Sequence, residues 1–194
     1  ATGLLVILLG DYTKKAPELS KLDKTYEVTM KLGETSTTGD AEGTITKIGR
    51  SSKKCNEIEV QKVLQSFEGE ILQTPPAYSA VKVAGKRAYK LAREGKEVKL
   101  EPRKVKVYNI KLGHKLDKNS AQGRTLRKDW YDFPFVKFTA RVSSGTYIRS
   151  LVEDIGQKLG TGAYMSDLRR TEIGKFNLKN AQKIGDLTQP RYLT

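Results

Sequence analysis

The spacing of apolar residues changes along this chain between the period of a strand and the period of a helix. In TYEVTMKLG, residues 25–33, Tyr26 and every second residue after it are apolar, as in a half-buried strand. In EIEVQKVLQSF, residues 57–67, apolar residues recur at three- and four-residue spacing after Asn56, a residue type that caps helices. Strand and helix patterns do not alternate as regular βαβ units, so we predict an α+β fold.

Later segments repeat these two patterns. RKVKVYNIKL, residues 103–112, and FVKFTARVSS, residues 135–144, predict strands. The residues expected to share one face of the first strand are Val105, Val107, Asn109 and Lys111. After the second strand, apolar residues recur at helical spacing and predict a helix with one buried face. These residues are Ile148, Leu151, Val152, Ile155 and Leu159.

The length of 194 residues is typical of one domain, and we expect residues 1–194 to form a single domain. Residues 73–95 combine a loop stiffened by Pro75 and Pro76 with a basic helix. Residues 113–129 are polar and show no periodicity, which predicts an insertion. Residues 1–10, ATGLLVILLG, are too short a run to cross a bilayer, so we expect a buried segment and no membrane partner.

Charge is the strongest compositional signal. Lys and Arg number 36 against 22 Asp and Glu, a net charge of +14, which points to a polyanionic partner, most often nucleic acid. A solvated basic surface without such a partner is the plainer alternative. One cysteine and one histidine exclude a disulfide framework and argue against a zinc site or a Ser-His or Cys-His triad. The single Cys55 suits a reducing cytosol, and we expect a cytoplasmic protein.

The pentapeptide GTYIR, residues 145–149, lies where a strand pattern becomes a helix pattern. Tyr147 and Arg149 have the same parity, so both side chains can face one cleft from a backbone that the following helix holds. Alone, this is an ordinary strand end. Tyr26 on another strand, Asp40 in a polar loop, and the aromatic and basic residues after Pro75 give it more weight, because stacking on bases and binding phosphates require such side chains.

These segments together resemble the TruB-type tRNA pseudouridine synthases, which isomerise a uridine in the T loop of tRNA. The resemblance extends from residue 1 to about residue 176, and its motifs occur in the family's order. They are ATGLLVILLGDYTK (1–14), KTY (24–26), LGETSTTGDAEG (32–43), PPAYSAVKVAGKRAYKLAREG (75–95), GTYIRSL (145–151) and LRR (168–170). It implies the catalytic fold of that family, a mixed, mostly antiparallel sheet flanked by helices and loops.

The resemblance also implies roles for five side chains. Tyr147 is expected in the active site, and Arg149 is expected to pair with the catalytic aspartate. Tyr26 is expected to stack on the target base and to act on its C5 proton. Leu168 matches the apolar residue of the pocket floor, and Asp40 matches the loop aspartate near the flipped nucleotide.

We expect residues 73–95, in which basic residues follow a loop stiffened by prolines, to fold over the T arm of tRNA as a mobile thumb. Its basic residues are expected to bind phosphates: Lys82, Lys86, Arg87, Lys90 and Arg93. Lys14 matches a lysine of the first motif, with a role that is either structural or phosphate-facing. The expected partner is the T-arm stem-loop of tRNA, bound by a monomer.

The nucleophile is missing from the matching motifs. In the family the catalytic aspartate belongs to a Gly-x-Leu-Asp-Pro-x-Ala-x-Gly motif, and this sequence begins at that alanine, so the aspartate would lie three residues before Ala1. Neither Asp11 nor Asp40 matches it. We therefore expect residues 1–194 alone to be inactive, and we expect no C-terminal RNA-binding domain of the PUA type within them.

Two functions from different classes remain open. The first is an isomerase that converts uridine to pseudouridine, for which the resemblance implies no metal and no cofactor. The alternative is a non-catalytic RNA-binding or tRNA-chaperone module with the same fold, and a ribosomal-type basic protein is a third, weaker candidate. The set of Tyr26, Tyr147 and Arg149 favours the enzyme, because a pure binder needs no arginine directed at a carboxylate.

Overall fold

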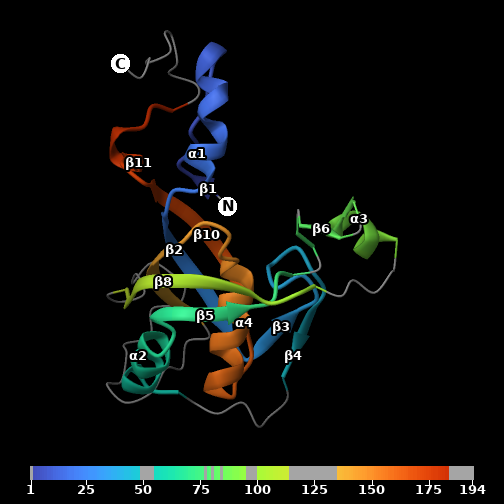
Figure 1. Ribbon diagram of the computed structural model, residues 1–194. Coiled ribbons are helices and arrows are strands. Elements are labelled where there is room, and N and C mark those ends of the chain that lie inside the picture. Colours follow the sequence, from blue (N-terminus) through green and yellow to red (C-terminus); the bar gives the residue numbers. More distant parts are fainter. Residues whose placement is uncertain are drawn as a thin grey trace.

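A seven-stranded sheet forms the centre of the protein (Figure 1). This computed structural model describes residues 2–48, 55–76, 78–79, 81–83, 85–94, 100–113 and 135–183. The strands, in spatial order, are β1 (Thr2–Gly3), β10 (Ala163–Ile173), β2 (Lys24–Leu32), β9 (Phe135–Val142), β8 (Arg103–Leu112) and β5 (Gly69–Gln73), with β11 (Phe176–Asn177) paired to β10. The β1–β10 pair is parallel and the other pairs are antiparallel, which confirms the predicted α+β fold with a mostly antiparallel sheet.

Two helices, α2 (Glu57–Gln65) and α4 (Ile148–Leu159), pack on one face of this sheet and share its apolar core. All five predicted apolar residues of α4 are buried, which confirms its predicted inner face. Asn56 caps α2 as predicted: its side chain accepts a hydrogen bond from the Glu59 backbone N–H, and the Glu59 carboxylate accepts one from the Asn56 N–H. The apolar periodicity therefore predicts the buried face of α4, and the cap predicts the start of α2.

Strand β8 departs from the predicted alternation. Val105 and Val107 are buried as expected, but Asn109 and Lys111 are exposed and Ile110 is buried in their place. A β-bulge between Val107 and Asn109 causes the change, because one extra residue in the strand reverses the parity of everything after it. The prediction that Asn109 and Lys111 share one face with Val105 and Val107 is wrong.

The N-terminal segment also differs from its prediction. Leu4 is buried and its N–H donates to the Arg170 carbonyl at 2.8 Å, but Leu5, Ile7 and Leu9 are all more than half exposed. Pairing with β10 is short, so the following residues are not held against the sheet in the described structure. They lead into the 3-10 helix η1 (Gly10–Lys15) and α1 (Ala16–Ser20). The expected buried segment is therefore buried only in part.

The remaining elements lie around the sheet. The hairpin of β6 (Lys82–Val83) and β7 (Lys86–Arg87) continues into α3 (Ala88–Arg93), the predicted basic helix, and this unit lies at the right of Figure 1. The hairpin of β3 (Glu34–Ser36) and β4 (Ile45–Lys47) contacts β10 through β3, and η2 (Leu178–Asn180) follows β11. Except for Gly113, the predicted insertion at 113–129 lies outside the described residues. No helix in the described ranges is long and apolar enough to cross a membrane.

Candidate active site

Arg149 is the second residue of α4, and its guanidinium joins two loops that are distant in sequence. Nη1 donates to Asp40 Oδ2 at 3.0 Å and to the Thr38 carbonyl at 3.1 Å, while Nη2 donates to the Tyr78 carbonyl at 2.8 Å. The side chains of Arg149 and Asp40 are 22% and 19% exposed, so the pair is shielded from most solvent. The planar guanidinium is suited to holding several acceptors in one fixed arrangement.

The Asp40 loop is itself held in place. Asp40 Oδ1 accepts hydrogen bonds from Thr38 Oγ1 at 2.6 Å and from the Glu42 backbone N–H at 3.1 Å. An isolated parallel bridge joins Asp40 to Met165 of β10, where the Met165 N–H donates to the Gly39 carbonyl at 3.0 Å. Both carboxylate oxygens of Asp40 are therefore used to fix the loop against α4 and the sheet.

Gly39 allows this loop to approach α4 closely. Its φ is +74°, in the left-handed region, and a Cβ there would lie 2.8 Å from Glu153 Oε1 and 3.3 Å from the Arg149 Cβ. Glu153 follows Arg149 by one helical turn, so its carboxylate rests against the loop. Burial of this carboxylate, followed by the negative charge of Asp154, raises the pKa of Glu153, and Arg149 partly opposes that rise.

Tyr147 immediately precedes α4 as its N-cap residue, and a buried glutamine fixes its backbone. Gln73 Oε1 accepts a hydrogen bond from the Tyr147 N–H at 2.7 Å, and Gln73 Nε2 donates to the Tyr147 carbonyl at 3.0 Å. The sequence reasoning did not identify Gln73. A signal was present, because Gln73 has the same strand parity as Ile71, which packs against the core.

Tyr26 and Leu168 lie on adjacent strands of the face that α4 covers. Leu168 of β10 is opposite Val28 of β2, and Tyr26 is two residues along the same strand. Tyr26 is buried in the core cluster that includes Ile148, and Leu168 packs against this cluster. The sheet and core thus connect these two residues to α4, whereas direct hydrogen bonds connect Asp40 to Arg149. The convergence of all five predicted residues on one cleft stays a prediction.

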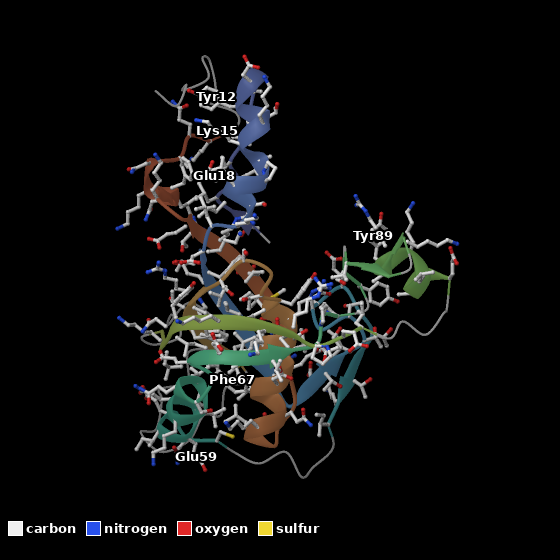
Figure 2. All side chains as sticks on the ribbon, in the orientation of Figure 1. Tyr12, Lys15, Glu18, Glu59, Phe67 and Tyr89 are labelled. Carbon is white, nitrogen blue, oxygen red and sulfur yellow. The ribbon has the colours of Figure 1, made fainter. Side chains whose placement is uncertain are left out.

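The predicted phosphate-binding residues divide into two groups. Lys86, Arg87 and Lys90 are exposed on β7 and α3. Figure 2 shows Tyr89 on this same unit, well separated from Phe67 and Glu59 around α2. Lys82 lies in β6 and Arg93 at the end of α3, and for these two only the backbone is described. Their binding roles stay predictions.

Lys14 is not part of this unit. It lies in η1 and forms an ion pair with Asp11 at 2.8 Å, with the two side chains 80% and 91% exposed. Such an exposed pair adds little stability. The structure therefore describes a local surface contact for Lys14, and its phosphate-facing role stays a prediction.

The opposite face of the sheet carries a separate groove of about 360 Å³, whose lining includes Glu27, Lys137, Asp167 and Arg169. None of the predicted site residues lines it. Within the described ranges, no group of three or more His, Cys, Asp or Glu side chains could hold a metal ion.

Comparisons with known proteins identify the family of this chain. A model of the N-terminal domain of TruB family pseudouridylate synthases matches residues 1–148, and a model of the C-terminal domain of tRNA pseudouridylate synthase B matches residues 149–193. The tRNA pseudouridine synthase B of Clostridium tetani is 42% identical over 189 residues, which cover 97% of this chain and 60% of the relative. That of Aquifex aeolicus is 41% identical over 181 residues, which cover 93% and 58%.

A solved structure of an H/ACA RNP, bound to a substrate RNA containing 2'-deoxyuridine, contains a chain with the same fold. The two chains superimpose with a TM-score of 0.51 and are 27% identical, and the match covers 87% of this chain and 34% of that chain. The present chain spans 60% or less of the length of the two bacterial relatives. Since the N-terminal family model alone matches residues 1–148 of 194, the chain belongs to the TruB family of pseudouridylate synthases.

Proposed function

We propose that the protein isomerises a uridine in the T loop of tRNA to pseudouridine, without a metal or cofactor. Family membership supports the reaction class. The observation that carries the proposal is the position of Arg149 at the start of α4, where Asp40, Thr38 and Tyr78 hold its guanidinium. An arginine fixed in this way can orient a reacting carboxylate and keep it ionised.

We place the nucleophile upstream of Ala1, in the segment that carries the family's catalytic aspartate. Arginine has five N–H donors. Three of the Arg149 donors bind Thr38, Asp40 and Tyr78, and the remaining two have no acceptor among the residues that the structure describes. We assign these two donors to the upstream carboxylate. Asp40 then acts as a second, fixed partner of Arg149 and not as the nucleophile.

The reaction that follows breaks one bond and forms another at the same ribose carbon. The ionised aspartate attacks C1′ of the bound uridine as the glycosidic bond between C1′ and N1 breaks, and the freed base turns. C5 of the base then attacks C1′, which forms the C1′–C5 bond and displaces the carboxylate. The proton on C5 is lost and N1 gains one, so the product has the same composition as the substrate.

Tyr26 and Leu168 are proposed to bind the base during this rearrangement. Tyr26 lies on β2 and Leu168 on β10, so the central sheet holds both side chains rigidly. A tyrosine ring can stack on a uracil and leave its hydroxyl near C5. The target uridine must leave its stack to reach them, because C1′ and C5 are inaccessible within the loop.

Binding of the RNA is assigned to the unit formed by β6, β7 and α3. Its exposed residues Lys86, Arg87 and Lys90 supply charge for phosphates, in keeping with the net charge of +14. The backbone of this unit is tied to the loop before it, because the Tyr89 N–H donates to the Ser79 carbonyl at 3.1 Å. We therefore assign residues 73–95 to a thumb that closes on the T arm.

The test compares residues 1–194 with a longer chain that includes the upstream segment. Both are incubated with a T-arm RNA that carries tritium at C5 of uridine, and released tritium is measured. We expect both chains to bind the RNA and only the longer chain to release tritium. Binding without release by both chains would favour the non-catalytic RNA-binding module. Rapid release by residues 1–194 would contradict the upstream nucleophile, and Asp40 would then be the first residue to substitute.

A further inference from the structure

We propose that Gln73 is a positioning residue for the isomerisation, and that it locks the segment Tyr147–Arg149 to the base of the thumb. This inference rests on the proposed function. It concerns a buried side chain at the start of residues 73–95, in β5 and not among the exposed basic residues of β7 and α3. Gln73 is the last residue of β5 and is only 2% exposed.

The first argument is the pairing of a buried amide. The Gln73 side chain binds both polar groups of the Tyr147 backbone, at 2.7 Å and 3.0 Å. This reciprocal pair resembles one rung of a β-ladder, made by a side chain in place of a strand. A buried amide that could not pair would be unfavourable, and here both of its polar atoms are used.

The second argument is the place where α4 begins. Tyr147 has extended dihedral angles, φ −96° and ψ 109°, and has no side-chain cap bond to the helix. Its carbonyl accepts the first helical hydrogen bond, from the Leu151 N–H at 3.1 Å, and also accepts the bond from Gln73. Gln73 therefore holds the peptide groups from which α4 starts, and the direction of Arg149 follows from that start.

The third argument is that two further bonds run between the same segments. Ser150 Oγ donates to the Thr74 carbonyl at 3.3 Å, and Arg149 Nη2 donates to the Tyr78 carbonyl at 2.8 Å. The start of α4 is thus bonded to three positions between residues 73 and 78. Pro75 and Pro76 lie between these positions and restrict the backbone. A shift of the thumb base would therefore move the acceptor of Arg149.

Substitution of Gln73 should have different effects if it only fills the core and if it positions Tyr147. A filler affects only stability, so its loss lowers the folded fraction without changing the turnover of the folded protein. A positioning residue affects kcat, because a displacement of about 1 Å at the reacting groups can lower a rate about 100-fold. The Kd for RNA distinguishes both of these roles from direct RNA binding. Gln73 is buried and the basic residues of β7 and α3 are exposed, so neither role requires Gln73 to contact the RNA.

The experiment uses the longer chain with the upstream segment, and the variants Gln73→Leu and Gln73→Glu. The control is Gln65→Leu, the same substitution at an exposed glutamine at the end of α2. With rates normalised to the folded fraction, Gln73→Leu should lower kcat about 10- to 100-fold and leave the Kd for T-arm RNA within about threefold. Gln65→Leu should leave both unchanged.

Gln73→Glu adds a pH signature. An ionised carboxylate keeps the acceptor for the Tyr147 N–H but loses the donor to the Tyr147 carbonyl, whereas the protonated form has both. Burial raises the pKa of the introduced carboxyl, so the rate of this variant relative to wild type should rise as the pH falls. A relative rate that is flat with pH would count against positioning by hydrogen bonds.

Amide hydrogen exchange gives a readout that does not depend on activity. The Tyr147 N–H should exchange faster in Gln73→Leu than in wild type, while the Leu159 region at the other end of α4 stays protected. Unchanged exchange at Tyr147, or a normalised kcat within twofold of wild type, would overturn the inference. If the wild-type longer chain released no tritium, the proposed function would fail, and the exchange result would still decide whether Gln73 positions Tyr147.

Discussion

The ion pair between Arg149 and Asp40 should contribute measurably to stability as well as to the site. We consider the substitutions Arg149→Ala and Asp40→Ala, alone and together. Each single change also removes other hydrogen bonds, such as those to Thr38 and Tyr78. A double-mutant cycle cancels these contributions and isolates the coupling between the two side chains.

The magnitude follows from the exposure of the pair. Fully exposed ion pairs contribute about 0 to 1 kcal/mol, and breaking a fully buried pair costs about 3 to 5 kcal/mol. Arg149 and Asp40 are 22% and 19% exposed with a hydrogen bond of 3.0 Å, so they lie between these limits. We expect a coupling free energy of about 2 kcal/mol, in the range of a charged hydrogen bond.

The assay is urea unfolding followed by far-ultraviolet circular dichroism. The chain offers a matched control in Lys14 and Asp11, an ion pair of 2.8 Å whose side chains are 80% and 91% exposed. The same cycle there should give less than about 0.5 kcal/mol. Equal coupling in the two pairs, or coupling below about 0.5 kcal/mol between Arg149 and Asp40, would refute the argument that shielding strengthens the site pair.

Three further predictions concern the loop, the pH dependence and the thumb. Gly39→Ala should lower the free energy of unfolding by about 1 to 3 kcal/mol, because φ is +74° and the added Cβ would meet Glu153. Thermal unfolding measures this loss, and an unchanged melting temperature would contradict it. Burial raises the pKa of Glu153, so the folded state binds its proton more tightly than the unfolded state, and stability falls as the pH rises from the ordinary pKa of glutamate through the raised value. Glu153→Gln should remove this loss and be more stable than wild type at pH 7 but not at pH 4. Urea unfolding at both pH values measures the difference in free energy of unfolding between variant and wild type, and an equal difference at the two pH values would disprove the prediction. Charge reversal of Lys86 and Arg87 together should weaken RNA binding and flatten its salt dependence by about one to two counterions, measured by filter binding, whereas reversal of Lys62 on α2 should match wild type.

Local sequence patterns are sufficient to predict the elements that bury a single face. Strand β2 and helix α4 were predicted because burial of a single face imposes a period of two or 3.6, and a long segment shows that period clearly. Strand β8 was predicted, but its later side chains were assigned to the wrong face. A bulge depends on the partner strand, and the period of β8 alone does not reveal it.

The motifs select residues for the candidate site, but they do not give the contacts between those residues. Arg149 and Asp40 were selected by their motifs, and the bond between them spans a separation of 109 residues that no local pattern encodes. Gln73 was missed because a polar residue before Pro75 resembles the start of a loop. Its strand parity with Ile71 is a local sign of burial, but Tyr147, the partner that satisfies its amide, is 74 residues away in the sequence.

Tritium release by the longer chain tests the central claim, that this family member uses Arg149 to control the carboxylate that attacks uridine. The measurement compares wild type with Arg149→Lys, which keeps the charge but loses the planar donors. Arg169→Lys is the control, since Arg169 is exposed at the groove on the opposite face of the sheet. We predict release by wild type and by Arg169→Lys, and a rate at least about 100-fold lower for Arg149→Lys. No release by wild type, or release by Arg149→Lys at the wild-type rate, would contradict the account.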